Sequence, residues 1–578
     1  MHQSVDFGTT FTSVAFAHSS SPDEVKLVRT WLNSRAGDET ADQVPSEVHY
    51  KNPITRERIW GYEIQDVTTN KGVPEALKWF KLLLQGQSAP SAFARLSISE
   101  PEPAAEDPSQ ATAIKLRKLN IRPVEVVTDF LASVRRVALA SIKDTYGEKK
   151  EIKVQYVLTI PAIWKDMEKS LMIQASENAG FGTHRVDFEL VGEPESAAAY
   201  TLKAIQPNNL DNGDTFVICD AGGGTVDLVS YKITQLNPLR LDEVVSGTGG
   251  RHGSVFLDHG FEQYIRNKLG DAAIDSMKPR CKNEMMRTWV ENVKLKFGNR
   301  TAFEYDVSVH GVPDDEDTNV EDGFHSMDLE DVKGIFDPVV DPIVKLVTHQ
   351  VQSVQRKGYN VKAILLVGGF GSSAYLLQRL QNTRYGGKVL QVLQPPNART
   401  AIARGALMRG LDGSVVKEKR SRRHYGFEVQ APFIADKGWD KHKCYNWIEE
   451  KWFVDGKLLW FLHKNDKIGD TMSASFKVYR VFDNLPRNLI FTVELRACDT
   501  DDSPEFIWMD PTALYSVCSV EADLSSIPRN KFRKMRNSSG DDYYEVHFTV
   551  CMSLTSDVLK FEVLFEGKPH GIATARFE

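Results

Sequence analysis

Residues 1 to 410 alternate between segments that have the pattern of buried strands and segments that have the pattern of helices. Strands are predicted where apolar residues run together, as in QYVLTIPAIW (155–164), DTFVICD (214–220) and VKAILLVGGF (361–370). Helical segments follow such strands, for example KDMEKSLMIQASENAG (165–180). This regular exchange of elements predicts an α/β architecture for the first 410 residues.

Beyond residue 424 the pattern changes to a period near two, which is typical of half-buried strands. Turn-like residues separate the repeats, so residues 425–578 are predicted to form an all-β domain. The segments that carry the pattern are SASFKVYRVF (473–482), LIFTVELRAC (489–498), YYEVHFTVCMSL (543–554) and VLKFEVLFEG (558–567).

The basic run KEKRSRR (417–423) stands where the pattern changes. We expect residues 411–424 to form a basic linker between the two domains, and a nuclear-import or docking patch is the alternative. Two further stretches are predicted to be solvated, mobile loops, with an acidic docking site as the alternative. They are SISEPEPAAEDPSQA (97–111) and GVPDDEDTNVEDG (311–323).

Composition narrows the classes of function. The formal net charge of -7 argues against non-specific binding to nucleic acid. The six cysteines are far apart in the sequence, so we expect free thiols in a reducing compartment, the cytoplasm, or the nucleus if the basic run directs import. No apolar run has the length of a membrane span, and MHQSVDFGTT lacks the pattern of a secretory signal. We expect a monomer.

The phrase DAGGGTVDLVSY (220–231) places three glycines between two strand-like runs, and a looser copy, VDFGTTFTSVAF (5–16), opens the chain. Glycines weaken a strand, but they let successive N–H groups turn toward one anion. Each phrase also has a carboxylate, Asp6 or Asp220, just before its turn, where it could face Mg²⁺. We therefore predict two similar half-domains that face one magnesium-bound polyphosphate.

A third glycine turn, at Gly368 and Gly369, supports this prediction, because such turns let a ligand approach the backbone. Competing motifs are missing from the sequence, which contains no GxxxxGK[ST], HExxH or GxSxG pattern. The phrase GTGGRHG (247–253) does not satisfy GxGxxG, since His252 occupies the last glycine position. We expect it to form a flexible turn near the nucleotide.

Five motifs, in their order along the chain, resemble the ATPase domain of the heat-shock protein 70 (DnaK-type) chaperones, within the actin and sugar-kinase superfamily. The resemblance covers about residues 4 to 410, and its pattern is closer to a divergent, lid-less branch. It implies an actin-like ATPase of two similar ribonuclease-H-like lobes around a nucleotide cleft, followed by a smaller β-rich domain. The motifs are VDFGTTFTS, LTIPAIWKD, VGEPESAAAY, CDAGGGTVDLVSY and LLVGGFGSS.

The resemblance implies a role for each matching residue. Mg²⁺ would be held through its waters by Asp6 and Asp220. Catalysis would fall to Lys81, Glu193, Thr225 and Asp227, with Lys78 as the runner-up to Lys81. ATP or ADP would be bound by Gly8, Thr9, Thr10, Gly222, Gly223, Gly224, Gly250, Gly253, Glu291, Lys294, Gly368 and Gly369. From the local sequence alone, Lys81 would be a solvated helical lysine and Glu193 a capping or surface acid.

The base-binding half departs from the family pattern. Leu295, in WVENVKLKFGN (289–299), stands where the family has a stacking arginine, so a planar cation is missing. Phe370 replaces a small polar residue, and Ser372 replaces an arginine. The phosphate-binding half therefore matches the family better than the half that would select the base.

The leading hypothesis is an ATP-binding, heat-shock 70-like protein in which ATP binding and slow Mg²⁺-dependent hydrolysis control lobe closure. Its partners would be protein or peptide clients, and co-chaperones. The alternative is a nucleotide-binding scaffold with little turnover, because the base pocket is altered and no long amphipathic helix follows the β region. A small-molecule kinase is a third class, and the β domain argues against it. The aromatic run KWFVDGKLLWFLH (451–463) is expected to be core, with a peptide groove as the alternative.

Overall fold

The computed structural model divides the chain into two compact units. The first comprises Met1–Gln87, Pro103–Trp164 and Leu171–Lys417, and the second is made chiefly of Glu418–Glu578. The structure describes residues 1–31, 41–66, 75–87, 107–147, 153–206, 209–299, 304–435, 437–468, 472–555, 558–572 and 574–577.

The first sheet of the N-terminal unit is built around the opening hairpin. Strand β1 (His2–Phe7) pairs antiparallel with β2 (Phe11–Ala17) and, on its other side, parallel with β8 (Gln155–Ile160). Strand β8 then pairs parallel with β9 (Phe188–Gly192). The short strands β3 (Lys26–Leu27) and β4 (Val44–Pro45) extend the sheet from β2. Almost every residue of β1 and β8 is buried, which explains their continuous apolar pattern.

The second sheet repeats this pairing scheme around the mid-chain hairpin. Strand β10 (Thr215–Ala221) pairs antiparallel with β11 (Val226–Leu236), which pairs antiparallel with β12 (Leu239–Gly250). On its other side β10 pairs parallel with β16 (Val361–Val367), and β16 pairs parallel with β19 (Gln391–Leu393). Each sheet therefore has one hairpin whose first strand has a parallel neighbour. Asp6 and Asp220 lie near the end of that first strand, just before the glycine turn.

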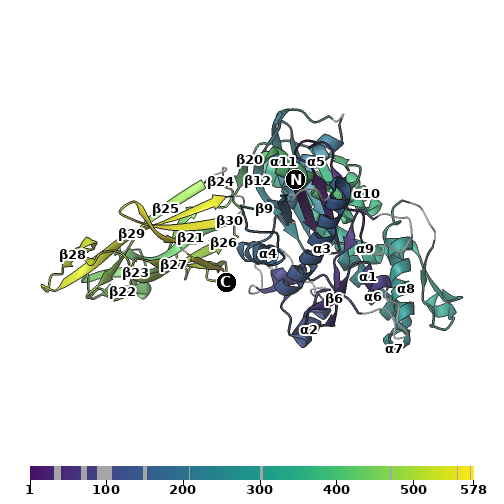
Figure 1. Ribbon diagram of the computed structural model, residues 1–578, viewed down its shortest axis with the longest axis horizontal. Coiled ribbons are helices and arrows are strands. Elements are labelled where there is room, and N and C mark those ends of the chain that lie inside the picture. Colours follow the sequence, from purple (N-terminus) through teal and green to yellow (C-terminus); the bar gives the residue numbers. More distant parts are fainter. Residues whose placement is uncertain are drawn as a thin grey trace. The chain divides into compact units, whose positions relative to one another are not determined.

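Helices of the first unit pack against these sheets and against one another (Figure 1). Helices α5 (Glu193–Ala204) and α11 (Ala401–Asp412) approach closely because α11 has a glycine where they meet. A Cβ on Gly405 of α11 would lie 1.7 Å from the carbonyl oxygen of Ser196 in α5. The larger helices are α3 (Pro123–Tyr146), α5 (Glu193–Ala204), α6 (Val255–Leu269), α9 (Leu329–Arg356), α10 (Ala374–Asn382) and α11 (Ala401–Asp412). The others include α1 (Glu63–Asp66), α2 (Gln110–Leu119), α4 (Asp166–Asn178), α7 (Asp271–Ser276), α8 (Pro279–Thr288) and a π-helical segment, Trp289–Lys294.

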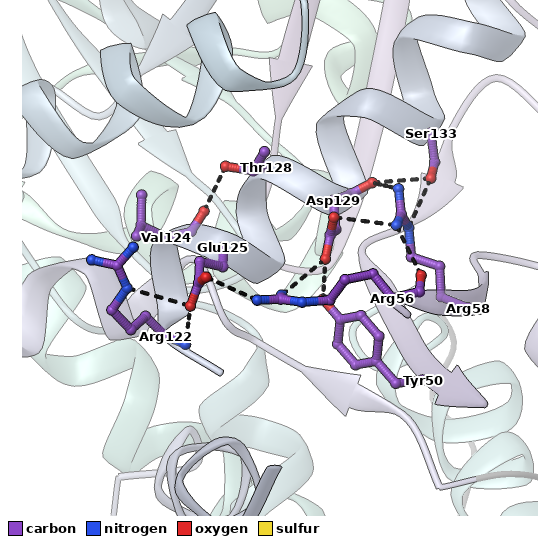
Figure 2. A network of polar contacts seen from close by, with 9 residues as sticks. All are labelled: Tyr50, Arg56, Arg58, Arg122, Val124, Glu125, Thr128, Asp129 and Ser133. Carbon is purple, nitrogen blue, oxygen red and sulfur yellow. Dashed lines mark hydrogen bonds and ion pairs between the residues drawn. The ribbon is translucent and has the colours of Figure 1, made fainter. Parts of the chain in front are cut away.

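A network of ion pairs ties a small sheet to α3 (Figure 2). This sheet consists of β5 (Glu47–Asn52), β6 (Glu57–Trp60) and β7 (Leu77–Lys78). Asp129 of α3 is the centre of the network: its carboxylate accepts hydrogen bonds from Tyr50, Arg56 and Arg58. The neighbouring carboxylate of Glu125 accepts a further bond from Arg56. The network is structural, since all its members are engaged with one another.

The two predicted mobile loops have different outcomes. Residues 311–323 are not a plain loop, because they contain a 3-10 turn, Glu316–Thr318, and strand β14 (Val320–Glu321). Strand β14 forms a sheet with β13 (Tyr305–Ser308) and β15 (Phe324–Met327), so the stretch is not loop throughout, although most of its residues are solvent-exposed as predicted. Of residues 97–111, positions 97–106 lie outside the described residues, and α2 begins at Gln110.

In the second unit, described residues from 424 onward form strands with short 3-10 turns (Figure 1). One sheet has the order β22 (Lys443–Asn446), β23 (Lys451–Leu462), β21 (His424–Pro432), β26 (Ile490–Cys498), β27 (Leu514–Asp523), β32 (Thr574–Phe577). The other has the order β25 (Met472–Phe482), β29 (Asp542–Thr555), β30 (Val558–Phe565), β31 (Lys568–Ile572), with β28 (Arg533–Arg536) also paired to β29.

Residues from both sheets of this unit contribute to one apolar core, including Phe427, Phe491 and Phe548. In the aromatic run 451–463, Phe453 is buried, whereas Trp452 remains 49% exposed. Core packing therefore accounts for one side of β23 and not for the other. Among the helices that the structure describes, none is both long enough and apolar enough to span a bilayer. All six cysteines are free thiols.

Candidate functional site

The glycine turns of the two hairpins lie against each other. A Cβ placed on Gly223 would fall 2.5 Å from Oγ1 of Thr10, and one placed on Gly224 would fall 2.6 Å from Oγ1 of Thr9. Real Cβ atoms do not approach other atoms so closely, so a larger residue at either position would have to displace a threonine side chain of the other turn. The two glycine-rich phrases that stand out in the sequence therefore lie together at one site in the first unit.

Two further glycine segments close on the same place. A Cβ on Gly253 would fall 2.2 Å from the carbonyl oxygen of Gly223, and the N–H of Val255 donates to that oxygen at 2.9 Å. A Cβ on Gly368, which has a φ of 88°, would fall 2.5 Å from Oδ1 of Asp220. Gly250, in contrast, lies in strand β12. The expectation of a flexible turn at 247–253 was wrong for residues up to Gly250.

Four carboxylates are buried beside these turns. Asp6, Glu193, Asp220 and Asp227 are between 1% and 7% exposed. Burial and the negative charge of Glu193 raise the pKa of Asp6 to about 7. Burial, followed by Glu193 and then Asp227, raises the pKa of Asp220 well above its usual value. These influences show that the four groups act on one another at short range.

Lys81 is the lysine that meets this cluster. Its Nζ donates to Oε1 of Glu193 at 2.9 Å, and both side chains are buried. The local expectation of a solvated helical lysine was wrong, because Lys81 precedes a short 3-10 helix, Leu82–Gln87, and is 5% exposed. The alternative candidate, Lys78, instead pairs with Glu47 at 3.2 Å and has a side chain that is 49% exposed. Glu193 is likewise buried, although it begins helix α5 as its sequence predicts.

Hydrogen bonds orient two of the carboxylates. Asp6 accepts from Oγ1 of Thr159 at 3.0 Å and from Oγ of Ser13 at 3.4 Å. Asp227 accepts from the backbone N–H of Ile163 at 2.9 Å. Thr159 and Ile163 were missed by the sequence reasoning, which matched the stretch LTIPAIWKD to a family motif but assigned it no role. The match of LTIPAIWKD to the family motif was the sequence feature that could have pointed to these two residues.

The cluster fits a hydrated cation. Oδ1 of Asp220 is buried and has no hydrogen-bond partner among the described residues, so it can accept from a water or a ligand. The mutual repulsion that raises the pKa values of Asp6 and Asp220 is a cost that a bound cation would offset. Within the described residues, no three His, Cys, Asp or Glu side chains are grouped to bind a bare metal ion. This arrangement fits Mg²⁺ that keeps its waters.

The residues predicted for the base have partners of their own. Lys294 pairs with Asp258 at 2.8 Å, and both side chains are mostly buried. Glu291 lies on the π-helical segment and pairs with Arg287 at 3.4 Å. Leu295 follows this segment with 47% of its surface exposed.

The comparisons with known proteins agree with the motifs. A family model described as Hsp70 protein matches residues 4–416. The chain belongs to the Hsp70 family. This confirms the family that the five motifs predicted.

Three relatives of this Hsp70-family chain are reported, of which the two named heat shock 70 kDa protein 12A and 12B support its place in a divergent branch. Heat shock 70 kDa protein 12A of Mus musculus is 25% identical over 511 residues, covering 75% of this chain and 72% of the relative. Heat shock 70 kDa protein 12B of Homo sapiens is 25% identical over 520 residues, covering 74% and 71%. A chaperone protein HscA homolog of Acinetobacter baumannii is 23% identical over 403 residues, covering 68% of this chain and 55% of the relative.

Proposed function

We propose that this chain binds Mg²⁺-ATP between two actin-like lobes and hydrolyses it slowly, so that nucleotide state controls the binding of protein clients. The ATPase domain would comprise residues 1–410, and the client-binding domain residues 425–578, joined by 411–424. The observation that carries this proposal is the meeting of two glycine turns beside four buried carboxylates and one buried lysine. The protein would act in the cytoplasm as a monomer with co-chaperones.

Each part of the site has a task in this proposal. The N–H groups of Gly223 and Gly224 and the hydroxyls of Thr9 and Thr10 would donate to phosphate oxygens. The N–H of Gly222, which the sequence also assigned to the phosphates, instead donates to the carbonyl oxygen of Thr225 at 2.9 Å and closes the turn. Asp6 and Asp220 would hold Mg²⁺ through its waters, and the ion would offset charge on the phosphates. Gly8 belongs to the turn that carries Thr9 and Thr10. This position is also tightly packed, since a Cβ on Gly8 would lie 2.1 Å from the carbonyl oxygen of Phe11.

The transfer to water would depend on positioning and charge rather than on covalent chemistry. Lys81 would bind an oxygen of the transferring phosphoryl group, and Thr225, which is 9% exposed, would donate to it. Glu193 and Asp227 would accept hydrogen bonds from the attacking water and hold it in line. Both carboxylates are already oriented, one by Lys81 and the other by the N–H of Ile163.

A second candidate is a nucleotide-binding scaffold with little turnover. It is favoured by the exposed Leu295 and by Lys294, which is already paired with Asp258. Weak contact with the base would lower affinity without affecting the phosphate turns. The two candidates share the binding site and differ in the rate of hydrolysis.

The test is a steady-state ATPase assay of the wild type and Asp220→Ala, together with thermal shift in Mg²⁺-ATP. We expect the wild type to hydrolyse ATP and the variant to lose at least tenfold, since removing a preorganised charge costs about that much. Stabilisation by Mg²⁺-ATP with background hydrolysis would support the scaffold. Equal background rates and no thermal shift at millimolar nucleotide would refute both candidates.

A further inference from the structure

The ammonium of Lys81 lies over two aromatic rings. Its Nζ is 5.4 Å from the ring centroid of Trp164 and 5.5 Å from that of Phe7. Both distances are within the range at which the face of an aromatic ring attracts a cation. The ammonium therefore has a carboxylate, Glu193, and two ring faces as neighbours, and all four side chains are buried.

Neither ring is free to move away. Phe7 is fully buried and stacks against Phe80 at a centroid distance of 6.1 Å. Trp164 is 2% exposed and belongs to the same apolar core as Phe7. Side chains in close-packed cores hold one rotamer, so the two faces form fixed walls beside the ammonium.

Aromatic walls have a consequence that aliphatic walls lack. A leucine in place of Trp164 would exclude water from Lys81 and give no attraction in return, which would favour displacement of the ammonium. A ring face excludes water and attracts the charge. Trp164 therefore suits a lysine that must stay charged, dry and fixed before a phosphate arrives.

The segment that carries Trp164 supports the other charged groups as well. Thr159 donates to Asp6, and the N–H of Ile163 donates to Asp227. The stretch from Thr159 to Trp164 thus contacts three charged groups of the cluster from one side. Such a shared support is the arrangement that keeps a site within the narrow geometry that catalysis requires.

We propose that Trp164 is a positioning residue that holds the charged Lys81 in its place for phosphoryl transfer, with Phe7 as a second aromatic wall. The proposal rests on the proposed function in one respect, the use of Lys81 in hydrolysis. It makes a separate physical claim, that the Trp164 ring and the Lys81 ammonium are energetically coupled, and this claim does not need activity.

The kinetic test compares Trp164→Leu, Trp164→Phe and a control, Trp31→Leu. Trp31 is 3% exposed in the same apolar core, so the control removes an equally buried indole, over whose ring no lysine or arginine of the described part of the chain lies. We expect Trp164→Leu to lower kcat about tenfold with little change in KM. Trp164→Phe should keep most of the wild-type kcat, because phenylalanine keeps a ring face. Trp31→Leu should leave kcat within about twofold of the wild type. Equal kcat in Trp164→Leu and the wild type would overturn the proposal.

The second test is a double-mutant cycle on the unfolding equilibrium in urea, using Lys81→Met and Trp164→Leu. The combined change in the unfolding constant should differ about tenfold from the product of the single changes, because the contact is lost only once. The cycle of Lys81→Met with Trp31→Leu should be multiplicative. If the Trp164 cycle is also multiplicative, the coupling is refuted whether or not the wild type hydrolyses ATP. An inactive wild type with a coupled cycle would refute the proposed function alone.

Discussion

At the scale of single residues, charge imbalance is the main property of the site. Four carboxylates are buried close together with Lys81 beside Glu193, and burial together with the neighbouring negative charges raises the pKa values of Asp6 and Asp220. A folded protein tolerates such an arrangement when a ligand later compensates it, which is why perturbed carboxylates gather at functional sites. The imbalance makes two predictions about the protein without ligand.

Lys81→Met should destabilise the ligand-free protein by about 3 kcal/mol, because removing one partner of a buried ion pair leaves the other charge uncompensated. Urea denaturation at pH 8 measures the loss. Lys78→Met is a matched control, since the same substitution three residues away breaks a pair whose lysine is 49% exposed. That control should cost less than about 1 kcal/mol. Similar losses in the two variants would contradict the burial of Lys81.

The raised pKa of Asp6 predicts how stability depends on pH. The pKa rises from an ordinary 3.8 to about 7 in the folded protein, through burial and then Glu193. The folded state therefore holds a proton that the unfolded state releases, so this contribution is complete below about pH 4 and is lost as pH rises to about 7. The total for one group is at most about 4 kcal/mol.

Asp6→Asn should flatten the fall in the free energy of unfolding between pH 4 and pH 7, because asparagine does not titrate. Urea denaturation across this range without nucleotide provides the comparison. A wild type whose stability rises over the same interval, with an equal slope in the variant, would show that Asp6 ionises normally.

Residue types and spacing predicted where the glycine turns and the paired carboxylates lie, because a backbone that must approach a ligand closely needs glycine whatever surrounds it. Spacing did not predict the burial of Lys81. That property depends on Glu193 and Trp164, which lie 112 and 83 positions away in the chain, so it arises only when segments far apart in the sequence fold together. Local sequence therefore predicts donors and acceptors better than it predicts their pKa values.

At the scale of elements, the close approach of α5 and α11 is set by one glycine. A Cβ on Gly405 would lie 1.7 Å from the carbonyl oxygen of Ser196, and this obstacle is backbone that cannot rotate away. Gly405→Ala should therefore destabilise the first unit by about 3 kcal/mol, as overpacking does. Thermal and urea unfolding would measure it.

Gly334→Ala is the control for Gly405→Ala, because Gly334 lies within helix α9 and a Cβ there meets nothing within 4 Å. Alanine has the higher helix propensity, so this variant should gain up to about 1 kcal/mol. A loss of stability in Gly405→Ala together with a gain in Gly334→Ala would establish that the backbone contact at Gly405, and not the substitution itself, causes the loss. A loss of less than 1 kcal/mol in Gly405→Ala would show that the helices separate easily.

The elements themselves were predicted best where the apolar pattern is long. The strands at 155–164, 214–220 and 361–370 are present as β8, β10 and β16. The acidic stretch 311–323 was predicted poorly, because its charged composition conceals strand β14, which pairs through its backbone with β15. Composition reports solvation of side chains, and pairing of the backbone does not require apolar residues.

At the scale of the whole molecule, the proposed function requires that nucleotide binding change the conformation of the chain segment that connects the two units. The division falls between Lys417 and Glu418, inside strand β20 (Val416–Arg420). Residues after the division are held by backbone bonds: Lys419 and Arg420 pair with strand β24 (Lys467–Ile468), and the N–H of Ser421 donates to Asp466 at 2.9 Å. Such a strand resists a protease until it opens.

Trypsin cleavage within 417–423 is therefore a readout of coupling. Cleavage needs several residues to leave the strand, so its rate reports the population of the open form. We expect Mg²⁺-ATP to change this rate at least threefold, because a two-state switch shifts only when a ligand binds one state better. Cleavage after Lys437, an exposed residue in the second unit, is the internal control and should not respond to nucleotide. Asp220→Ala should abolish the response. If Mg²⁺-ATP stabilises the protein against heat and the 417–423 rate stays the same, the chain binds nucleotide without the proposed coupling.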